Sequence, residues 1–565
     1  MARQALARVC RYVAYAAVAL NVMSLVRPVL LPDFLVGHDA GAHQTYVFLF
    51  TRALEQGQVP VRWVEGVADG MGQPLFNHYQ VGFYYMVALL HGVGLELTLA
   101  LKLMVAIAWT GGATFMFLLC RPLGSLPAIL AATVFVSSPY LLVDVYVRSA
   151  YPELTAIALM PGVLWAMLGV LRTGRRRYVC VLALTTALLL TSHLPATLVI
   201  APVAAGVLVA SGIVHRRPRR HVLLVGVGGL VGAGMAAFYV LPAILQLDAI
   251  HINRVTSDAF DYHRHFVRPA WWFDRSWGYA GSGQGADDQM SFQVGVVQWL
   301  VLAATVGLLA TPRFRRHVSA STTAMLGWLS VVAGALFMMT AAAAPLWELV
   351  WPMTFIQFPW RLLMLPAIAC GVLAAVLLSA VRDRFMQAVL VVCVVAVQWQ
   401  MTAPYRAIAS ARERSAMDID DPAWPTTERA RDAAFREPAY DPITVGQQRA
   451  PARGRWTVDG EADVTAVSVT DAHLDLAISA PKAVRFVVHS AAYPGWQLTV
   501  DGEAVPPAID DASGYMAIDV PAGSHRVTAA FRRDGTRTVA ELISLTSFIA
   551  WLTLAIGPPG WRRPG

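Results

Sequence analysis

The segment Gly37-His38-Asp39-Ala40-Gly41-Ala42-His43 lies just after the first long apolar run of the chain, residues 12–31. It opens a polar and aromatic loop that extends to Tyr79, in a half of the chain that otherwise keeps charge out of its apolar runs. A carboxylate between two imidazoles is costly at the edge of an apolar bundle, and ionisable groups in such places are functional candidates. We therefore predict a membrane scaffold that holds Asp39 at its outer face.

The composition indicates an integral membrane protein. Of the 565 residues, 56% are hydrophobic and only 14% are charged, whereas soluble domains carry about 25% charged residues. The net charge of +8 comes from arginines clustered between apolar runs, a pattern that reports topology and does not indicate nucleic-acid binding. The five cysteines form no CxxC pair and none follows residue 402, so we predict no cysteine metal site and no disulfide in that region.

Twelve apolar runs are suitable for membrane spans. They are residues 12–31, 98–119, 123–143, 154–171, 178–192, 196–214, 222–244, 292–311, 320–342, 361–381, 385–402 and 541–557. With the amino terminus in the cytoplasm, these spans place every arginine cluster between them on the cytoplasmic face. The short, glycine-interrupted segment 81–95 has to be left out, and we interpret it as a re-entrant or membrane-surface helix.

After residue 455 the hydrophobic period changes to two, and short strand-like runs with Asp-Gly turns predict a β-sandwich. The predicted strands are 455–459, 463–469, 474–479, 484–489, 496–501, 516–520 and 525–531. The expected organisation is a polytopic α-helical membrane domain with the site in its outer loop 32–80, a linker, an extracytoplasmic β-sandwich, and a final transmembrane helix with a cytoplasmic tail. These parts cover residues 1–402, 403–450, 451–538 and 539–565.

An ordered set of motifs resembles a known family. The stretches are His38-Asp39, 70–74 (GMGQP), 148–153 (RSAYPE), 192–194 (SHL), 357–361 (QFPWR), and 493–502 with its YPGW and VDG elements. They are similar to bacterial integral membrane proteins described as 6-pyruvoyl-tetrahydropterin-synthase-related and to YfhO-type membrane proteins. No three-histidine zinc pattern at helical or strand spacing accompanies them, so the resemblance does not extend to the soluble pterin synthase. It implies a multi-pass protein of the bacterial cytoplasmic membrane.

The surroundings of Asp39 are also similar to those in the C-type glycosyltransferase (GT-C) superfold, where an acidic residue in the first outer loop precedes a surface helix. Here residues 44–57 match that helix. The resemblance implies a polyprenyl-phosphate-linked sugar as donor, an envelope glycan or lipid as acceptor, and a reaction at the extracytoplasmic face of the lipid bilayer. Many members have Asp-Glu where this chain has Asp39-Ala40, which affects a metal-binding role more than a general-base role.

Each candidate residue has a chemical role and a structural alternative. Asp39 is the expected general base, or an N-cap of the following helix. Arg148 and Arg361, at predicted outer helix ends, are expected to bind phosphate oxygens, or to snorkel or pair with a carboxylate. Glu153 would pair with Arg148 or orient the sugar, and His193 would cap a helix end or contact substrate.

The remaining candidate substrate-binding residues are His38, His43, His78, Tyr79 and Gln357. The three histidines could instead assemble a divalent metal ion with Asp39, an alternative that the sequence leaves open. Tyr79, Trp63 and Trp360 could stack on sugars or anchor the membrane interface.

Three functions from different classes fit these observations. The first is a membrane glycosyltransferase. The second is a transporter or flippase of lipid-linked saccharides. The gathering of the polar residues on one face argues against this function, because a transport path needs polar groups on both sides of the membrane midplane. The third is a non-catalytic envelope-assembly or glycan-binding protein, which would use the β-sandwich but leave His38-Asp39 unexplained.

Overall fold

The computed structural model describes residues 2–32, 34–35, 37–65, 72–214, 216–278, 281–282, 290–311, 320–411, 414–415, 419–420, 441–442, 454–510 and 513–557. Within these residues, eight helices are long and apolar enough to cross a membrane, or up to ten if each of two bent helix pairs is one span. The eight belong to α1 (Ala2–Leu30), α5 (Leu97–Cys120), α8 (Tyr151–Thr173), α10 (Leu194–Val214), α15 (Ala320–Met338), α17 (Met364–Ser379), α18 (Arg384–Ala411) and α20 (Gly535–Ile556).

The bent pairs account for two further predicted spans. Helix α6 (Ser125–Val136) continues through α7 (Pro139–Val143) and the π-helical turn η3 (Asp144–Arg148) with a bend of 47°. Helix α11 (Arg219–Met235) continues as α12 (Ala237–Leu245) with a bend of 69°.

The predicted count of twelve spans is not confirmed. The runs 178–192 and 292–311 form α9 (Arg176–Ser192) and α13 (Val296–Ala310), which have 17 and 15 residues and are short for a crossing. Segment 81–95 forms α4 (Gly82–Gly92), whose 11 residues reach about 16 Å, roughly half of an apolar bilayer core. Helix α4 is therefore too short to cross the membrane alone. This agrees with the arginine pattern, which requires that segment 81–95 is not counted as a span.

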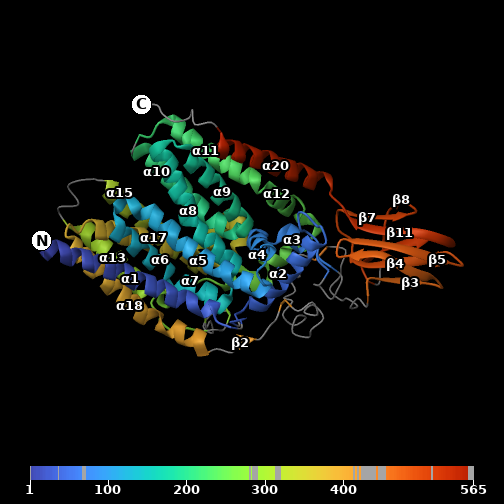
Figure 1. Cartoon of the computed structure of the whole chain (residues 1–565), viewed down its shortest axis with the longest axis horizontal. Helices are drawn as coiled ribbons and strands as arrows, with labels where there is room; N and C mark the ends of the chain where they lie inside the picture. Colours follow the sequence, from blue (N-terminus) through green and yellow to red (C-terminus); the bar gives the residue numbers. More distant parts are fainter. Residues whose placement is uncertain are drawn as a thin grey trace.

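The helical part ends next to the β-strands at α2 (Ala40–Glu55) and α3 (Leu75–His78), as Figure 1 shows. Helix α1 begins and α20 ends at the opposite end of the helical part. Helix α8 packs against α5 and α9, and α6 packs against α17. Helix α16 (Ala344–Leu349) and the 3₁₀ turns η11 (Trp351–Ile356) and η12 (Pro359–Leu363) connect α15 to α17.

The β-region (residues 454–531) consists of two antiparallel sheets. One has the order β3 (Trp456–Asp459), β6 (Val484–Ala491), β10 (Tyr515–Val520), β9 (Ala508–Ile509). The other has the order β4 (Asp463–Thr470), β5 (His473–Ala480), β11 (Gly523–Phe531), β7 (Trp496–Val500), β8 (Glu503–Val505). All seven predicted strands are confirmed, and the short strands β8 and β9 are additional.

The segment predicted as a linker, 403–450, lies largely outside the described residues. Its described parts contact the helical part. Strand β2 (Arg414–Ser415) pairs with β1 (Phe34–Leu35), and the Asp420 carboxylate accepts the backbone N–H groups of Leu97 and Thr98 at the start of α5.

Trp63 joins the helical part to the β-region. It lies in the loop after α2, is fully buried, and belongs to the same apolar cluster as the sheet residues. Its ring centroid is 5.3 Å from that of Trp496, 5.4 Å from Phe531 and 6.2 Å from Tyr493. Trp63 therefore fills a core shared by both parts. It is neither a sugar-stacking surface nor an anchor in the membrane interface, which corrects both interpretations above.

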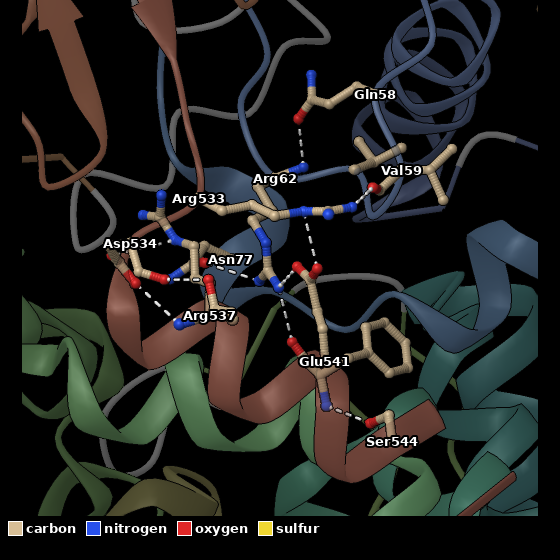
Figure 2. A network of polar contacts seen from close by, with 12 residues as sticks. Gln58, Val59, Arg62, Asn77, Arg533, Asp534, Arg537, Glu541 and Ser544 are labelled. Carbon is tan, nitrogen blue, oxygen red and sulfur yellow. Dashed lines mark hydrogen bonds and ion pairs between the residues drawn. The ribbon is translucent and has the colours of Figure 1, made fainter. Parts of the chain in front are cut away.

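A polar network also joins the loop after α2 to α20, as shown in Figure 2. The Arg62 guanidinium donates to Asn77 Oδ1 at 3.0 Å and to Glu541 Oε1 of α20 at 3.1 Å. Arg533 pairs with the other Glu541 oxygen at 2.9 Å and donates to the carbonyl of Val59 at 3.1 Å. The first turns of α20 are thus tied to the loop that follows α2.

A buried carboxylate lies in the same junction. Glu65 Oε1 accepts hydrogen bonds from Trp63 Nε1 at 2.9 Å and Ser490 Oγ at 3.0 Å, and pairs with Arg455 at 3.1 Å. Burial raises the pKa of Glu65 to about 7, although Arg455 opposes the shift.

Replacing Trp63 by alanine is expected to lower the free energy of unfolding by about 3–5 kcal/mol, because it leaves a cavity in the shared core. Thermal unfolding of the full-length protein in detergent measures the change. Trp399→Ala is the matched control, since Trp399 is 40% exposed on α18. Equal losses in the two variants would contradict the shared core.

Stability is also expected to depend on pH through Glu65. Its folded pKa of about 7 exceeds the unfolded value of 4.5, so between these values the folded state binds more protons and stability falls as pH rises. Glu65→Gln removes this ionisation. The difference in unfolding temperature between wild type and variant should therefore change between pH 4.5 and 7, and parallel curves would refute the assignment.

Candidate active site

A cavity of about 670 Å³ brings together eight of the ten predicted site residues. They are His38, Asp39, His78, Tyr79, Arg148, His193, Gln357 and Arg361. Its volume lies within the roughly 300–1,000 Å³ of small-molecule pockets. The residues come from segments more than 300 positions apart, so the fold and not the local sequence assembles the site.

Backbone hydrogen bonds place Asp39 beside Arg148. The N–H of His38 donates to the carbonyl of Val147 at 2.9 Å, and the N–H of Asp39 donates to the carbonyl of Arg148 at 2.8 Å. The loop that precedes α2 is therefore held against the end of the π-helical turn.

Gly37 permits this close approach. A Cβ atom at Gly37 would lie 2.0 Å from Ser149 Oγ, so no larger residue fits without displacing one of the two segments. Ser149 itself has a left-handed φ of 58°, which an L-residue adopts only when its surroundings impose it.

The Asp39 carboxyl group lies in the cavity wall and makes no capping hydrogen bond to α2. Burial raises its pKa, while the nearby charges of Arg148, His38 and Arg361 lower it, in that order of size. The N-cap alternative is thus not supported by the side-chain geometry. The carboxyl is instead a titratable group facing a cavity that carries positive charge.

Glu153 is the centre of the charged network. Its Oε2 accepts Arg148 Nη2 at 2.9 Å and Arg361 Nε at 3.1 Å, and its Oε1 accepts the hydroxyl of Tyr140. Arg148 also bonds Asp144 through Nη1. Glu153 is 1% exposed and does not line the cavity, so it pairs with the arginines and its alternative role in orienting a sugar is corrected.

Aromatic rings fix the planes of both guanidinium groups. Arg148 lies over the Trp360 ring at 4.6 Å, and Arg361 lies over Phe358 at 4.9 Å. Trp360 is 2% exposed and packs as a wall of the cavity. It therefore supports Arg148 and does not anchor a membrane interface.

Each arginine keeps donors for a ligand. Arg361 uses Nε for Glu153 and Nη1 for the carbonyl of Ile356 at 2.8 Å and for Gln357 Oε1 at 2.9 Å. The bonds of Arg148 to described residues likewise number three. Since a guanidinium has five N–H donors, two donors on each side chain make no hydrogen bond to a described residue.

The histidines do not converge. His43 lies behind the wall, where its Nδ1 is 2.7 Å from the Tyr84 hydroxyl, and burial lowers its pKa to about 3. His78 Nε2 is 2.9 Å from the hydroxyl of Tyr493 in the β-region, and burial lowers its pKa to about 3 as well. The predicted substrate contact of His43 is therefore corrected, because its ring packs among aromatic side chains.

His193 has the predicted capping role and also faces the cavity, so its contact with substrate stays a prediction. Its Nδ1 accepts the backbone N–H of Ala196 at the start of α10, and the residue also lines the cavity. Among the residues described, no group of three or more His, Cys, Asp and Glu side chains is placed to hold a metal ion. The metal arrangement of the three histidines with Asp39 is thus not formed.

The sequence did not reveal the apolar wall of the cavity. It is built from α10, α12 and η11 and includes Leu194, Leu198, Val240, Ile244 and Phe355. These residues lie within or beside apolar runs, so nothing in the sequence distinguishes them from lipid-facing or core residues. Asp144 was also missed, although a carboxylate at the end of the run 123–143 was a usable signal.

Replacing Glu153 by alanine is expected to destabilise the protein by about 3–5 kcal/mol, because it leaves two buried guanidinium groups without their shared carboxylate. Thermal unfolding in detergent measures the loss. Glu348→Ala is the control, since the Glu348 side chain is 63% exposed. A loss no larger than that of the control would show that Glu153 does not hold the arginines.

Comparison with solved structures finds distant similarities. Two structures of the arabinofuranosyltransferase AftD from mycobacteria are 18% identical to the chain, with TM-scores of 0.43 and 0.46, and cover 71% and 72% of it. The chain spans less than a third of the AftD chains, 27% and 29%. ArnT from Cupriavidus metallidurans bound to undecaprenyl phosphate is 14% identical, with a TM-score of 0.31, covering 64% of this chain and 77% of ArnT.

No curated protein matches the sequence. Residues 76–406, more than half of the chain, match the family described as 6-pyruvoyl-tetrahydropterin synthase related domain, a family of membrane proteins. The match includes α3 from its second residue, the π-helical turn with Arg148, and η12 with Arg361. The chain therefore belongs to the 6-pyruvoyl-tetrahydropterin synthase related family of membrane proteins.

Proposed function

We propose that this protein is a membrane glycosyltransferase that transfers a sugar from a polyprenyl-phosphate donor to a cell-envelope glycan or lipid at the extracytoplasmic face. The observation that carries the proposal is the cavity of about 670 Å³ in which Asp39, two guanidinium groups and an apolar wall meet. The carboxylate can act as a base, the guanidinium groups can bind a phosphate, and the apolar wall can bind a hydrocarbon chain.

The donor phosphate fits the arginine pair. Arg148 and Arg361 are held in place by Glu153 and by aromatic rings, and each keeps two N–H donors. Guanidinium groups bind phosphate oxygens in a fixed geometry. The apolar wall formed by α10, α12 and η11 would take the first isoprene units of the lipid.

The transfer itself needs one base. As the bond between the anomeric carbon and the phosphate oxygen breaks, the acceptor oxygen bonds to that carbon and its proton passes to the Asp39 carboxylate. The bonding electrons leave with the phosphate, whose charge Arg148 and Arg361 stabilise. A single displacement of this kind inverts the anomeric carbon, and general-base help of this type contributes about 10²–10⁴-fold.

The topology predicted from the sequence supports reaction at the outer face. In this predicted topology, the arginine clusters lie on the face opposite the loop 32–80, and cytoplasmic loops are the ones enriched in Lys and Arg. The β-region contacts the cavity wall through Tyr493 and His78. An acceptor from the envelope would therefore meet the donor beside the two sheets.

Replacing Asp39 by asparagine is expected to abolish transfer without unfolding the protein, because the amide keeps the shape and loses the base. Envelope glycans from cells carrying wild type, Asp39→Asn and a deletion are compared by mass spectrometry, with membrane levels of the variant measured in parallel. The expected result is loss of the same sugar in the variant and the deletion. Asp463→Asn, at an exposed position on β4, is the matched control.

Two outcomes would contradict the proposal. If the deletion removes a sugar that Asp39→Asn retains, Asp39 is not the base, and transport or envelope assembly accounts better for the protein. If the deletion changes the location of a lipid-linked saccharide and not its attachment, the protein is a transporter.

A further inference from the structure

A second cavity, of about 610 Å³, lies at the other end of α8. Its walls come from α10 and α15, and its floor comes from α5, α8 and α17. Arg172 at this cavity and Glu153 at the candidate active site are separated by about 28 Å along α8, at 1.5 Å per residue. The two cavities are thus distinct sites.

The lining is apolar apart from its mouth. Leucine, valine, proline and alanine side chains dominate, and the charged lining residues in the described part of the chain are Arg172 and Arg217. No carboxylate is among the described lining residues. A hydrocarbon chain suits the interior, and an anion suits the mouth.

The two arginines lack the counter-charge that the active-site arginines have. The charge of Arg217 acts unfavourably on Arg172, and Arg217 Nε is buried without a hydrogen-bond partner. Within the described residues, neither guanidinium forms an ion pair with Asp or Glu. A buried donor without a partner is costly, so an anion bound between the two side chains would relieve both the repulsion and the missing bond.

The cavity opens between two helices. Gly206 of α10 and Gly327 of α15 both line it, and a Cβ atom at either position would meet nothing within 4 Å. Helices that pack directly through small residues leave no such space. The gap between α10 and α15 therefore gives a lipid chain a lateral path into the cavity.

We propose that this cavity binds an anionic phospholipid, with an acyl chain between α10 and α15 and the phosphate between Arg172 and Arg217. Two guanidinium groups without carboxylates favour a net negative headgroup, because the ammonium of a zwitterionic lipid would meet the same repulsion. Basic pockets between transmembrane helices bind anionic headgroups in this way. The site is independent of the proposed glycosyl transfer.

Native mass spectrometry of the delipidated, full-length protein tests the site. The protein is offered equal amounts of dioleoylphosphatidylglycerol and dioleoylphosphatidylcholine. The expected result is a single retained phosphatidylglycerol and at least a tenfold loss of that adduct in the double variant Arg172→Gln with Arg217→Gln. The matched control is Arg382→Gln with Arg384→Gln, which removes two exposed charges outside the cavity.

A second variant distinguishes lipid binding inside the cavity from lipid binding to surface charge. Gly206→Leu with Gly327→Leu fills the gap, keeps both arginines and raises helix propensity, so it should fold and still lose the retained lipid. The control variant should retain phosphatidylglycerol. Equal retention of both phospholipids by the wild type would overturn the proposal, as would retention of phosphatidylglycerol by the Arg172/Arg217 variant or by the Gly206/Gly327 variant. Displacement of phosphatidylglycerol by an equal amount of undecaprenyl phosphate would also overturn it, since the occupant would then be a lipid-linked substrate.

Discussion

One carboxylate oxygen, Glu153 Oε2, accepts a hydrogen bond from each of two buried guanidinium groups, and the geometry of the candidate site depends on this arrangement. Removing such charges from water costs several kcal/mol per ion, which their attraction recovers only when the geometry is good. The network therefore does little for net stability. Its effect is to fix Arg148 and Arg361, which come from different halves of the helical part, at one place.

The position of Asp39 depends on this network. The backbone of the loop before α2 donates hydrogen bonds to the carbonyl groups of Val147 and Arg148, and this brings Asp39 to the arginines. Helix α2 runs from Asp39 to the following loop, which carries Trp63, and Trp63 is buried among the rings of the β-region. Helix α2 therefore connects the candidate catalytic carboxyl group to the two sheets.

Local patterns predicted much of the fold, and packing decided the rest. Strand periods and apolar runs depend on neighbouring residues, so all seven predicted strands were recovered and each predicted apolar run lies on a helix or bent helix pair. The number of spans was not recovered, because length and bending of a helix depend on its packing. His38 and His43 were equivalent in the sequence, yet only His38 lines the cavity, because α2 turns His43 into an aromatic cluster. Likewise Trp63 had no local feature that distinguished a shared core from a sugar platform.

The two cavities show that the partners of an arginine pair determine its chemistry. At one end of α8, Glu153 balances Arg148 and Arg361, and the Asp39 carboxyl faces the same space. A phosphate bound there would meet both positive charge and a base. At the other end, the described lining of the second cavity offers two guanidinium groups and no carboxylate. An anion bound there would be held, but no side chain of that described lining could take a proton from a hydroxyl, so this second site is suited to binding alone.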